Sequence, residues 1–236
     1  MAEYVTAAIR KGLHTIIFLE HLEVAVRTNR RTWLSRYDFK EYFATGAQLQ
    51  QQYSGRIRII LGVEIGWNPH AVDEIEKLLR TFPWQWRGLS YHFYWDGCRH
   101  LNLVSNNPED LKQLAAIGSE QILDHYFQQI INAHQQLPCQ VICHLDAALR
   151  HLPQTSLTAN HNNLLEILFR KMAANGTRLE VNTSGLALRK TPFPAPRIIQ
   201  HALSHGISLH PGSDAHHPDQ VGRFFELLPG LISGSS

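Results

Sequence analysis

Short apolar runs alternate with stretches of helical periodicity along most of this 236-residue chain. The runs have the length and residue content of β-strands, and they are Thr15–Leu19, Ile57–Glu64, Gly88–Phe93, Gln140–His144, Arg178–Asn182 and Ile207–Gly212. Helices are predicted near residues 3–13, 38–53, 69–80, 119–136, 160–175, 194–205 and 218–228. Strands separated by helical crossovers form a parallel sheet covered on both faces, which is either a barrel or a doubly wound sheet.

The start of the chain favours the barrel. No glycine-rich phosphate loop follows the first predicted strand, so the usual support for a nucleotide-binding doubly wound sheet is missing. A single α/β barrel commonly occupies about 250 residues, which suits this chain. We therefore predict one domain over residues 1–230 and a short tail over residues 231–236, with long polar loops at 94–118 and 183–196.

Composition excludes several classes of protein. Hydrophobic residues make up 44% of the chain and charged residues 18%, which is typical of a folded enzyme and not of a disordered chain. The net charge of +2 is scattered, so no nucleic-acid partner is expected, and no apolar run approaches the roughly 20 residues of a membrane span. Three cysteines without an export signal predict a reducing cytoplasm.

Metal-capable side chains stand at or just beyond the ends of the predicted strands. They are His21, Glu64, His92, His144, Asp214 and His216. In a parallel barrel all strands end at one face, so residues distant in sequence converge there. Imidazole and carboxylate together suit zinc, manganese or iron, and neighbouring ions suit phosphate ester hydrolysis. The other histidines, among them His201 and His205, are expected to be structural or surface residues.

The order and content of these motifs resemble the polymerase and histidinol phosphatase (PHP) superfamily, and within it the histidinol-phosphate phosphatases. The resemblance runs from about residue 3 to residue 228. Glu20 stands where the family usually has Asp before the first of these histidines. The motifs that carry the resemblance are Glu20-His21, Gly62-Val63-Glu64, Ser90-Tyr91-His92, Cys143-His144-Leu145-Asp146, Leu179-Glu180-Val181-Asn182-Thr183-Ser184-Gly185-Leu186 and Gly212-Ser213-Asp214-Ala215-His216.

The resemblance implies a fold, a cofactor and a reaction. The fold would be a distorted TIM-like (β/α)7 barrel with up to three zinc, manganese or iron ions. The reaction would be hydrolysis of a phosphate monoester by metal-activated hydroxide, most specifically of L-histidinol phosphate in histidine biosynthesis. The family's first strand, with its His-x-His motif, has no counterpart before Glu3, so we expect the first barrel strand to be missing. The oligomeric state stays open.

The same resemblance suggests roles for individual residues. Glu64 would bridge two metals because a carboxylate has two oxygens to share, and Asp214 would bind metal and orient the attacking hydroxide, with His216 beside it. A phosphate dianion also needs cationic groups, and a guanidinium fork matches phosphate oxygens. Arg150 and Arg189 are the predicted substrate-binding residues, and Lys190 is a weaker substitute for Arg189.

Two alternatives to histidinol phosphatase remain. One is another PHP phosphoesterase that acts on nucleotides or small phosphate esters. The other is an inactive PHP domain that serves as a scaffold or binding module, which the absent His-x-His motif suggests. A polymerase-associated proofreading module is disfavoured, because the chain has neither a polymerase sequence nor a basic groove.

Overall fold

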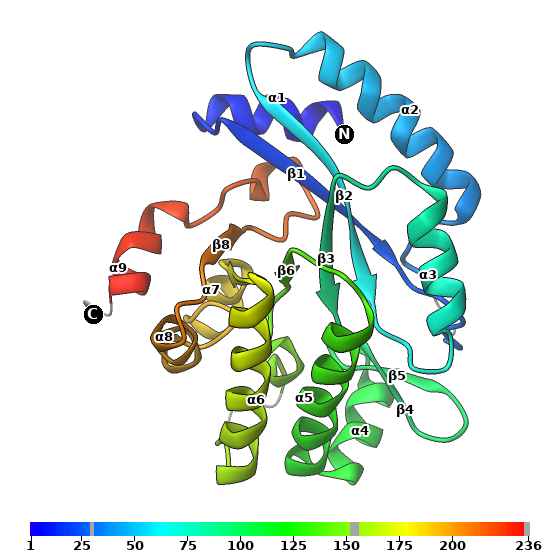
Figure 1. Ribbon diagram of the computed structural model, residues 1–236, viewed down its shortest axis with the longest axis vertical. Coiled ribbons are helices and arrows are strands. Elements are labelled where there is room, and N and C mark those ends of the chain that lie inside the picture. Colours follow the sequence, from blue (N-terminus) through cyan, green and yellow to red (C-terminus); the bar gives the residue numbers. More distant parts are fainter. Residues whose placement is uncertain (29–30, 152–155, 234–236) are drawn as a thin grey trace.

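The computed structural model describes residues 1–28, 31–151 and 156–233. Its main sheet has six parallel strands in the order β1-β2-β3-β6-β7-β8. Their bounds are Thr15–Leu22, Arg58–Gly66, Trp86–Ser90, Val141–Ile142, Arg178–Asn182 and Leu209–Gly212. The sheet curls, and the helices lie around its outer side (Figure 1). The edges of the sheet are β1 and β8, and within the described ranges no further strand lies between them.

Of the main helices, one precedes the first strand, and the others link successive strands of the sheet. The main ones are α1 (Ala2–Arg10), α2 (Arg36–Gln52), α3 (Val72–Thr81), α5 (Ser119–Gln136), α6 (Ala159–Asn175) and α8 (Pro196–Ser204). Local sequence sets their ends: Thr158 caps the start of α6, and Gly176 ends it in a left-handed conformation with φ of 67°. In α8, Pro196 occupies the first turn, where its missing N–H is not needed.

The region 94–118 differs from the predicted loop. It contains most of an antiparallel hairpin, β4 (Phe93–Trp95) and β5 (His100–Asn102), and then helix α4 (Pro108–Ile117). The carboxylate of Asp96 accepts hydrogen bonds from the N–H groups of Cys98 and Arg99 and so builds the turn. The side chain of Asn107 caps α4, and Pro108 begins it. Helix α7 (Ser184–Arg189) likewise occupies part of the predicted loop 183–196.

The predicted helix over 218–228 is wrong. Two single 3-10 turns occupy this region, Pro218–Gln220 and Phe225–Leu227, followed by α9 (Leu228–Ser233). Gly222 and Phe224 have φ values of 60° and 59°, which no right-handed helix accommodates. Helix α9 passes the predicted boundary at residue 230, and residues 234–236 of the predicted tail lie outside the described residues. The extent of a single domain over 1–230 stays a prediction.

The core fills the space between the sheet and the helices. Its largest fully buried side chains include Trp67, Tyr126, Phe39 and Phe169. Inside the curled sheet the strands approach closely: a Cβ on Gly88 would lie 2.5 Å from Sγ of Cys143. In the described part of the chain, no helix is both long and apolar enough to span a bilayer.

Helix α6 offers a matched test of this packing. Leu165 is 1% exposed and belongs to the core, whereas Ile167, two residues on, is 45% exposed. We expect Leu165→Ala to lower the free energy of unfolding by about 2–5 kcal/mol, because it leaves a cavity. Ile167→Ala should change it by less than about 0.5 kcal/mol. Urea unfolding of both variants measures the difference, and equal losses would contradict the observed orientation of α6.

Candidate metal centre

Four of the predicted donors meet at the carboxyl ends of neighbouring strands. His21 in β1 lies directly opposite Glu64 in β2 in the parallel register. His92 follows β3 and His144 follows β6, each two residues beyond its strand. The strand order therefore places these side chains side by side, as the pattern of strand ends predicted.

Glu64 lies at the centre of this group. Its Oε1 is 2.7 Å from Nε2 of His144 and 3.1 Å from Nε2 of His92, and its Oε2 is 3.8 Å from Nδ1 of His21. The two Nε2 atoms of His92 and His144 are 3.4 Å apart. Two ligands about 2.1 Å from one tetrahedral zinc ion are separated by about 3.4 Å, so these imidazoles already have the spacing of a metal site.

At the strand ends, two groups of three donors fit a metal ion. One is Glu64, His92 and His144, and the other is His21, Glu23 and His92; in each, the donor atoms lie within 4.8 Å of one another. The Nδ1 atom of His144 is also buried without a hydrogen-bond partner among the described residues. Because His92 belongs to both groups, the arrangement suits neighbouring ions.

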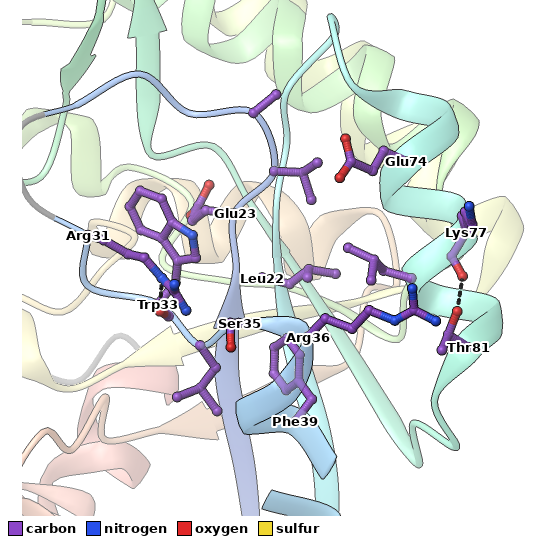
Figure 2. A pocket seen from close by; sticks show the side chains of 14 residues that line it. Leu22, Glu23, Arg31, Trp33, Ser35, Arg36, Phe39, Glu74, Lys77 and Thr81 are labelled. Atoms are coloured by element: carbon purple, nitrogen blue, oxygen red, sulfur yellow. Dashed lines mark hydrogen bonds between the residues drawn. The ribbon is translucent and has the colours of Figure 1, made fainter. Parts of the chain in front are cut away.

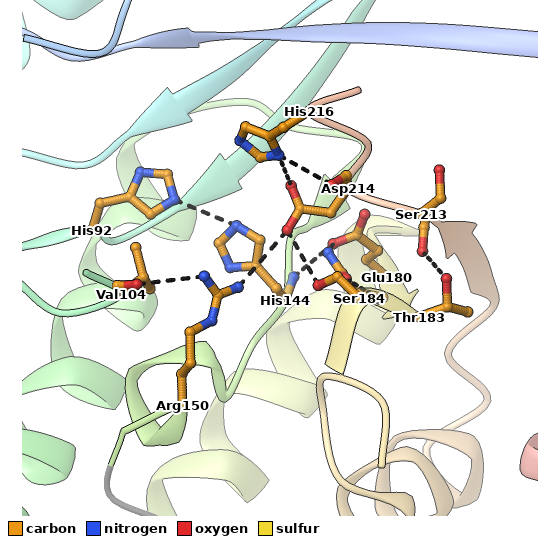
Figure 3. Close-up of polar contacts among 12 residues, drawn as sticks. His92, Val104, His144, Arg150, Glu180, Thr183, Ser184, Ser213, Asp214 and His216 are labelled. Carbon is orange, nitrogen blue, oxygen red and sulfur yellow. Dashed lines mark hydrogen bonds and ion pairs between the residues drawn. The ribbon is translucent and has the colours of Figure 1, made fainter. Parts of the chain in front are cut away.

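Asp214 and His216 lie at the edge of the group, beyond β8 (Figure 3). Oδ1 of Asp214 is 3.6 Å from Nδ1 of His216, whose side chain is 70% exposed. The His216 ring centroid is 6.2 Å from that of His21, so this pair faces the β1 side of the site. Oδ2 of Asp214 accepts a hydrogen bond from Oγ of Ser184 at 3.3 Å.

Two buried carboxylates of the site were not assigned a role from the sequence. Oε1 of Glu23 is 2.6 Å from Nδ1 of His92, and Oε2 of Glu180 accepts the backbone N–H of His144 at 2.8 Å. Glu180 lies within a motif that was used only as a mark of the family. A carboxylate that holds the second nitrogen of a metal-binding imidazole fixes its tautomer and orientation. Glu23 has that geometry toward His92.

Glycines make room for both carboxylates. A Cβ on Gly66 would collide with the carboxylate of Glu23, and one on Gly212 would collide with that of Glu180. A larger residue at the end of β2 or β8 would therefore push one of these carboxylates out of its observed position.

The charges of the site are strongly coupled. Burial by itself raises the pKa of Glu64, but His21, His144 and His92 lower it, and the pKa lies well below its usual value. Burial, against the opposing charge of His144, raises the pKa of Glu180 to about 7. Four carboxylates gather here: Glu23, Glu64 and Glu180 are buried, and the Asp214 side chain is 20% exposed. Buried negative charge on this scale needs cations, and a divalent ion would supply them.

Two of the site residues have an unusual backbone conformation. His144 has φ of 26° and Asp214 has φ of 47°. Such left-handed conformations are uncommon outside glycine and cluster at functional sites. The hydrogen bond from His144 N–H to Glu180 is one of the contacts that hold this conformation.

The predicted phosphate-binding residues have different surroundings. Nη2 of Arg150 is 3.8 Å from Oδ2 of Asp214, so this guanidinium reaches the site. Arg189 instead donates to both oxygens of Asp146, at 2.8 and 2.9 Å, and to the carbonyl of Pro192. Lys190 is exposed at the end of α7. Of the three, Arg150 alone has a contact with a predicted metal ligand among the described residues.

Two cavities adjoin the donor cluster. A cleft of about 470 Å³ lies between β1 and β8 and is lined by His21, Glu64, His144 and Asp214. A second cavity of about 370 Å³ lies on the side of α2 and α3, with Glu23 in its wall (Figure 2). The donor cluster is therefore open to molecules from the cleft.

The architecture is an α/β fold with a curled, open parallel sheet and a histidine and carboxylate cluster at its strand ends, and comparisons identify its family. A model of the PHP domain matches residues 1–184. The chain belongs to the PHP domain family, which confirms the resemblance seen in the sequence.

Curated relatives match nearly the whole chain. A protein of Deinococcus radiodurans, named as a probable histidinol-phosphatase, is 28% identical over 96% of this chain and 84% of its own length. The histidinol-phosphatase of Bacillus subtilis is 25% identical over 97% of this chain and 91% of its own.

Solved structures confirm the fold. A candidate histidinol phosphatase from Listeria monocytogenes superposes with a TM-score of 0.84 at 16% identity, over 95% of this chain and 92% of its own. The histidinol phosphate phosphatase of Lactococcus lactis, complexed with zinc, L-histidinol and phosphate, gives a TM-score of 0.74 at 20% identity, over 99% of this chain and 86% of its own. The predicted TIM-like α/β class is therefore confirmed.

The contact between Glu23 and His92 yields a test. We expect Glu23→Ala to weaken zinc binding by about 10- to 100-fold, because His92 loses the carboxylate that orients it. Competition with a coloured chelator measures the affinity. Glu74→Ala, which removes a carboxylate from the neighbouring cavity wall, is the control and should leave zinc binding unchanged. Equal affinities in the two variants would contradict the role of Glu23.

Proposed function

We propose that this protein is a metal-dependent phosphatase that hydrolyses L-histidinol phosphate to L-histidinol and phosphate. The observation that carries the proposal is the convergence of three imidazoles from three strand ends on Glu64. The names of its relatives support the choice of substrate. The zinc, L-histidinol and phosphate bound to the Lactococcus structure support it as well.

The proposed ligands are His21, Glu64, His92, His144, Asp214 and His216. A bound zinc, manganese or iron ion supplies a Lewis acid and a hydroxide nucleophile at neutral pH. Glu64 turns its two oxygens toward different imidazoles, as a bridging carboxylate must. Asp214 lies beside Arg150, so it would orient the attacking hydroxide toward a phosphate group held by the guanidinium.

Arg150 is the proposed phosphate-binding residue. Its Nε is buried without a hydrogen-bond partner in the described part of the chain, and its guanidinium lies 5.2 Å from the ring centroid of Phe193. A phosphate oxygen would satisfy donors that the protein leaves free. Arg189 lies 4.0 Å from the same ring, and its Nε is likewise buried without a hydrogen-bond partner among the described residues, but its Nη2 is held by Asp146. It stays a predicted contact for the substrate, with Lys190 beside it.

The two arginines should respond differently to substitution. Arg150→Gln should lower kcat/KM for histidinol phosphate by about 10- to 100-fold through loss of charged hydrogen bonds, with little change in stability. Arg189→Gln should lower the unfolding midpoint, because it leaves the buried Asp146 unpaired. Steady-state kinetics and thermal unfolding of both variants separate the effects. An unchanged kcat/KM in Arg150→Gln would remove Arg150 from the substrate site.

The metal assignment is tested at His144. We expect His144→Ala to lose bound metal and activity together while the far-ultraviolet circular dichroism stays close to that of the unchanged protein. Elemental analysis after dialysis measures the metal. Retention of stoichiometric metal in this variant would count against the assignment.

Substrate choice distinguishes the proposal from its alternatives. The metal-loaded protein should turn over histidinol phosphate well above p-nitrophenyl phosphate and nucleotides, as measured by phosphate release. Equal or faster turnover of nucleotides would favour another PHP phosphoesterase. Metal binding without turnover of any ester would favour a scaffold or binding module.

We also propose that the protein works in the cytoplasm. Its three cysteines are free, and the buried one, Cys143, lies within the core beside Gly88. Thiols persist in this form in a reducing compartment.

A further inference from the structure

A second cluster of metal donors lies on the outer helices, separate from the strand ends. Helix α6 contributes Glu166, helix α8 contributes His201, and the residue that caps the end of α8 is His205. Oε2 of Glu166 is 3.0 Å from Nε2 of His201 and 2.9 Å from Nε2 of His205. The three donor atoms lie within 4.8 Å of one another. Both imidazoles therefore turn the same nitrogen toward one carboxylate oxygen.

The surroundings hold these side chains in place. His201 lies in the last turn of α8, and His205, four residues on, is the C-cap residue that directly follows the helix. The buried ring of Phe169 packs against both imidazoles, with centroid distances of 5.1 and 6.1 Å. Nε of Arg170 donates to Oε1 of Glu166 at 2.7 Å, which leaves Oε2 to the imidazoles. The carboxylate is oriented by a second partner, as metal-binding carboxylates commonly are.

The spacing suits a small divalent ion. In a tetrahedral zinc site two ligand atoms about 2.1 Å from the metal are about 3.4 Å apart, so the observed separations near 3 Å need only small side-chain rotations. The three side chains are 30%, 18% and 33% exposed for His201, His205 and Glu166, so an ion can enter and water can complete its coordination.

We propose that Glu166, His201 and His205 form a second zinc site that joins helix α8 to helix α6. Zinc would replace two N–H to carboxylate hydrogen bonds by three coordinate bonds and release any proton held between the groups. Helix α6 leads into β7, which carries Glu180, and α8 leads into β8, which ends before Asp214. The ion would therefore stabilise the packing of the two helices that support this half of the barrel. It takes no part in the phosphatase chemistry proposed above.

The test counts zinc ions and measures stability. The experimental variant is His201→Gln/His205→Gln, in which glutamine still donates hydrogen bonds to Glu166. The matched control is His14→Gln/His70→Gln, which removes two exposed histidines outside both clusters. Native mass spectrometry after equilibration with zinc should show one ion fewer in the experimental variant than in the unchanged protein and the control. Added zinc should raise the unfolding temperature of the chelator-treated control but raise that of the experimental variant less.

The outcomes separate this proposal from the catalytic one. Loss of one ion with unchanged turnover of p-nitrophenyl phosphate supports a second site, and equal zinc counts in experimental variant and control overturn it. If the double variant does not fold, Glu166→Gln decides: it keeps an oxygen acceptor but removes the anionic ligand, and zinc binding as tight as in the unchanged protein overturns the proposal. His144→Ala should retain this second ion, so failure of the catalytic assignment leaves the test intact.

Discussion

The buried carboxylate of Glu64 is the constraint on which the site depends. A carboxylate in the interior is stable only when cations or strong hydrogen bonds surround it, and here three imidazoles provide them. Those imidazoles come from β1 and from the loops after β3 and β6, so the parallel sheet must keep its register for Glu64 to be accommodated. Fold and chemistry are thus coupled through one side chain.

Two further buried carboxylates, Glu23 and Glu180, hold two of the histidines that surround Glu64. Glu23 holds His92 from one side, and Glu180 holds the backbone of His144 from the other. Each occupies space that a glycine of another strand leaves free. A metal ion bound among these groups would neutralise charge that the protein itself balances only in part. Binding of the ion would reduce the repulsion among the carboxylates, and this reduction would contribute to its affinity.

Sequence patterns were sufficient to predict that the strand-end donors lie together. Strand polarity alone places His21, Glu64, His92 and His144 at one face of the sheet. Sequence patterns were insufficient wherever a role depends on a distant contact. Glu23 is separated from His92 by 69 residues, and no local pattern joins them. Arg189 was predicted to bind phosphate, and no local pattern showed its ion pair with Asp146, 43 residues earlier.

Secondary structure was likewise predictable where it depends on local periodicity, and unpredictable where it depends on short segments or distant contacts. The long periodic helices were predictable, whereas the hairpin of β4 and β5 was not, because its strands are only three residues each and its turn depends on Asp96. The helical spacing of His201 and His205 was visible in the sequence. Their shared partner on α6 was not, since it depends on how two helices pack.

The left-handed backbone at His144 and Asp214 has an evolutionary consequence. Such a conformation costs a residue with a Cβ about 1–3 kcal/mol, and glycine would avoid most of that cost. Glycine, however, has no donor atom to offer an ion. Selection for stability and selection for chemistry therefore oppose each other at these two positions.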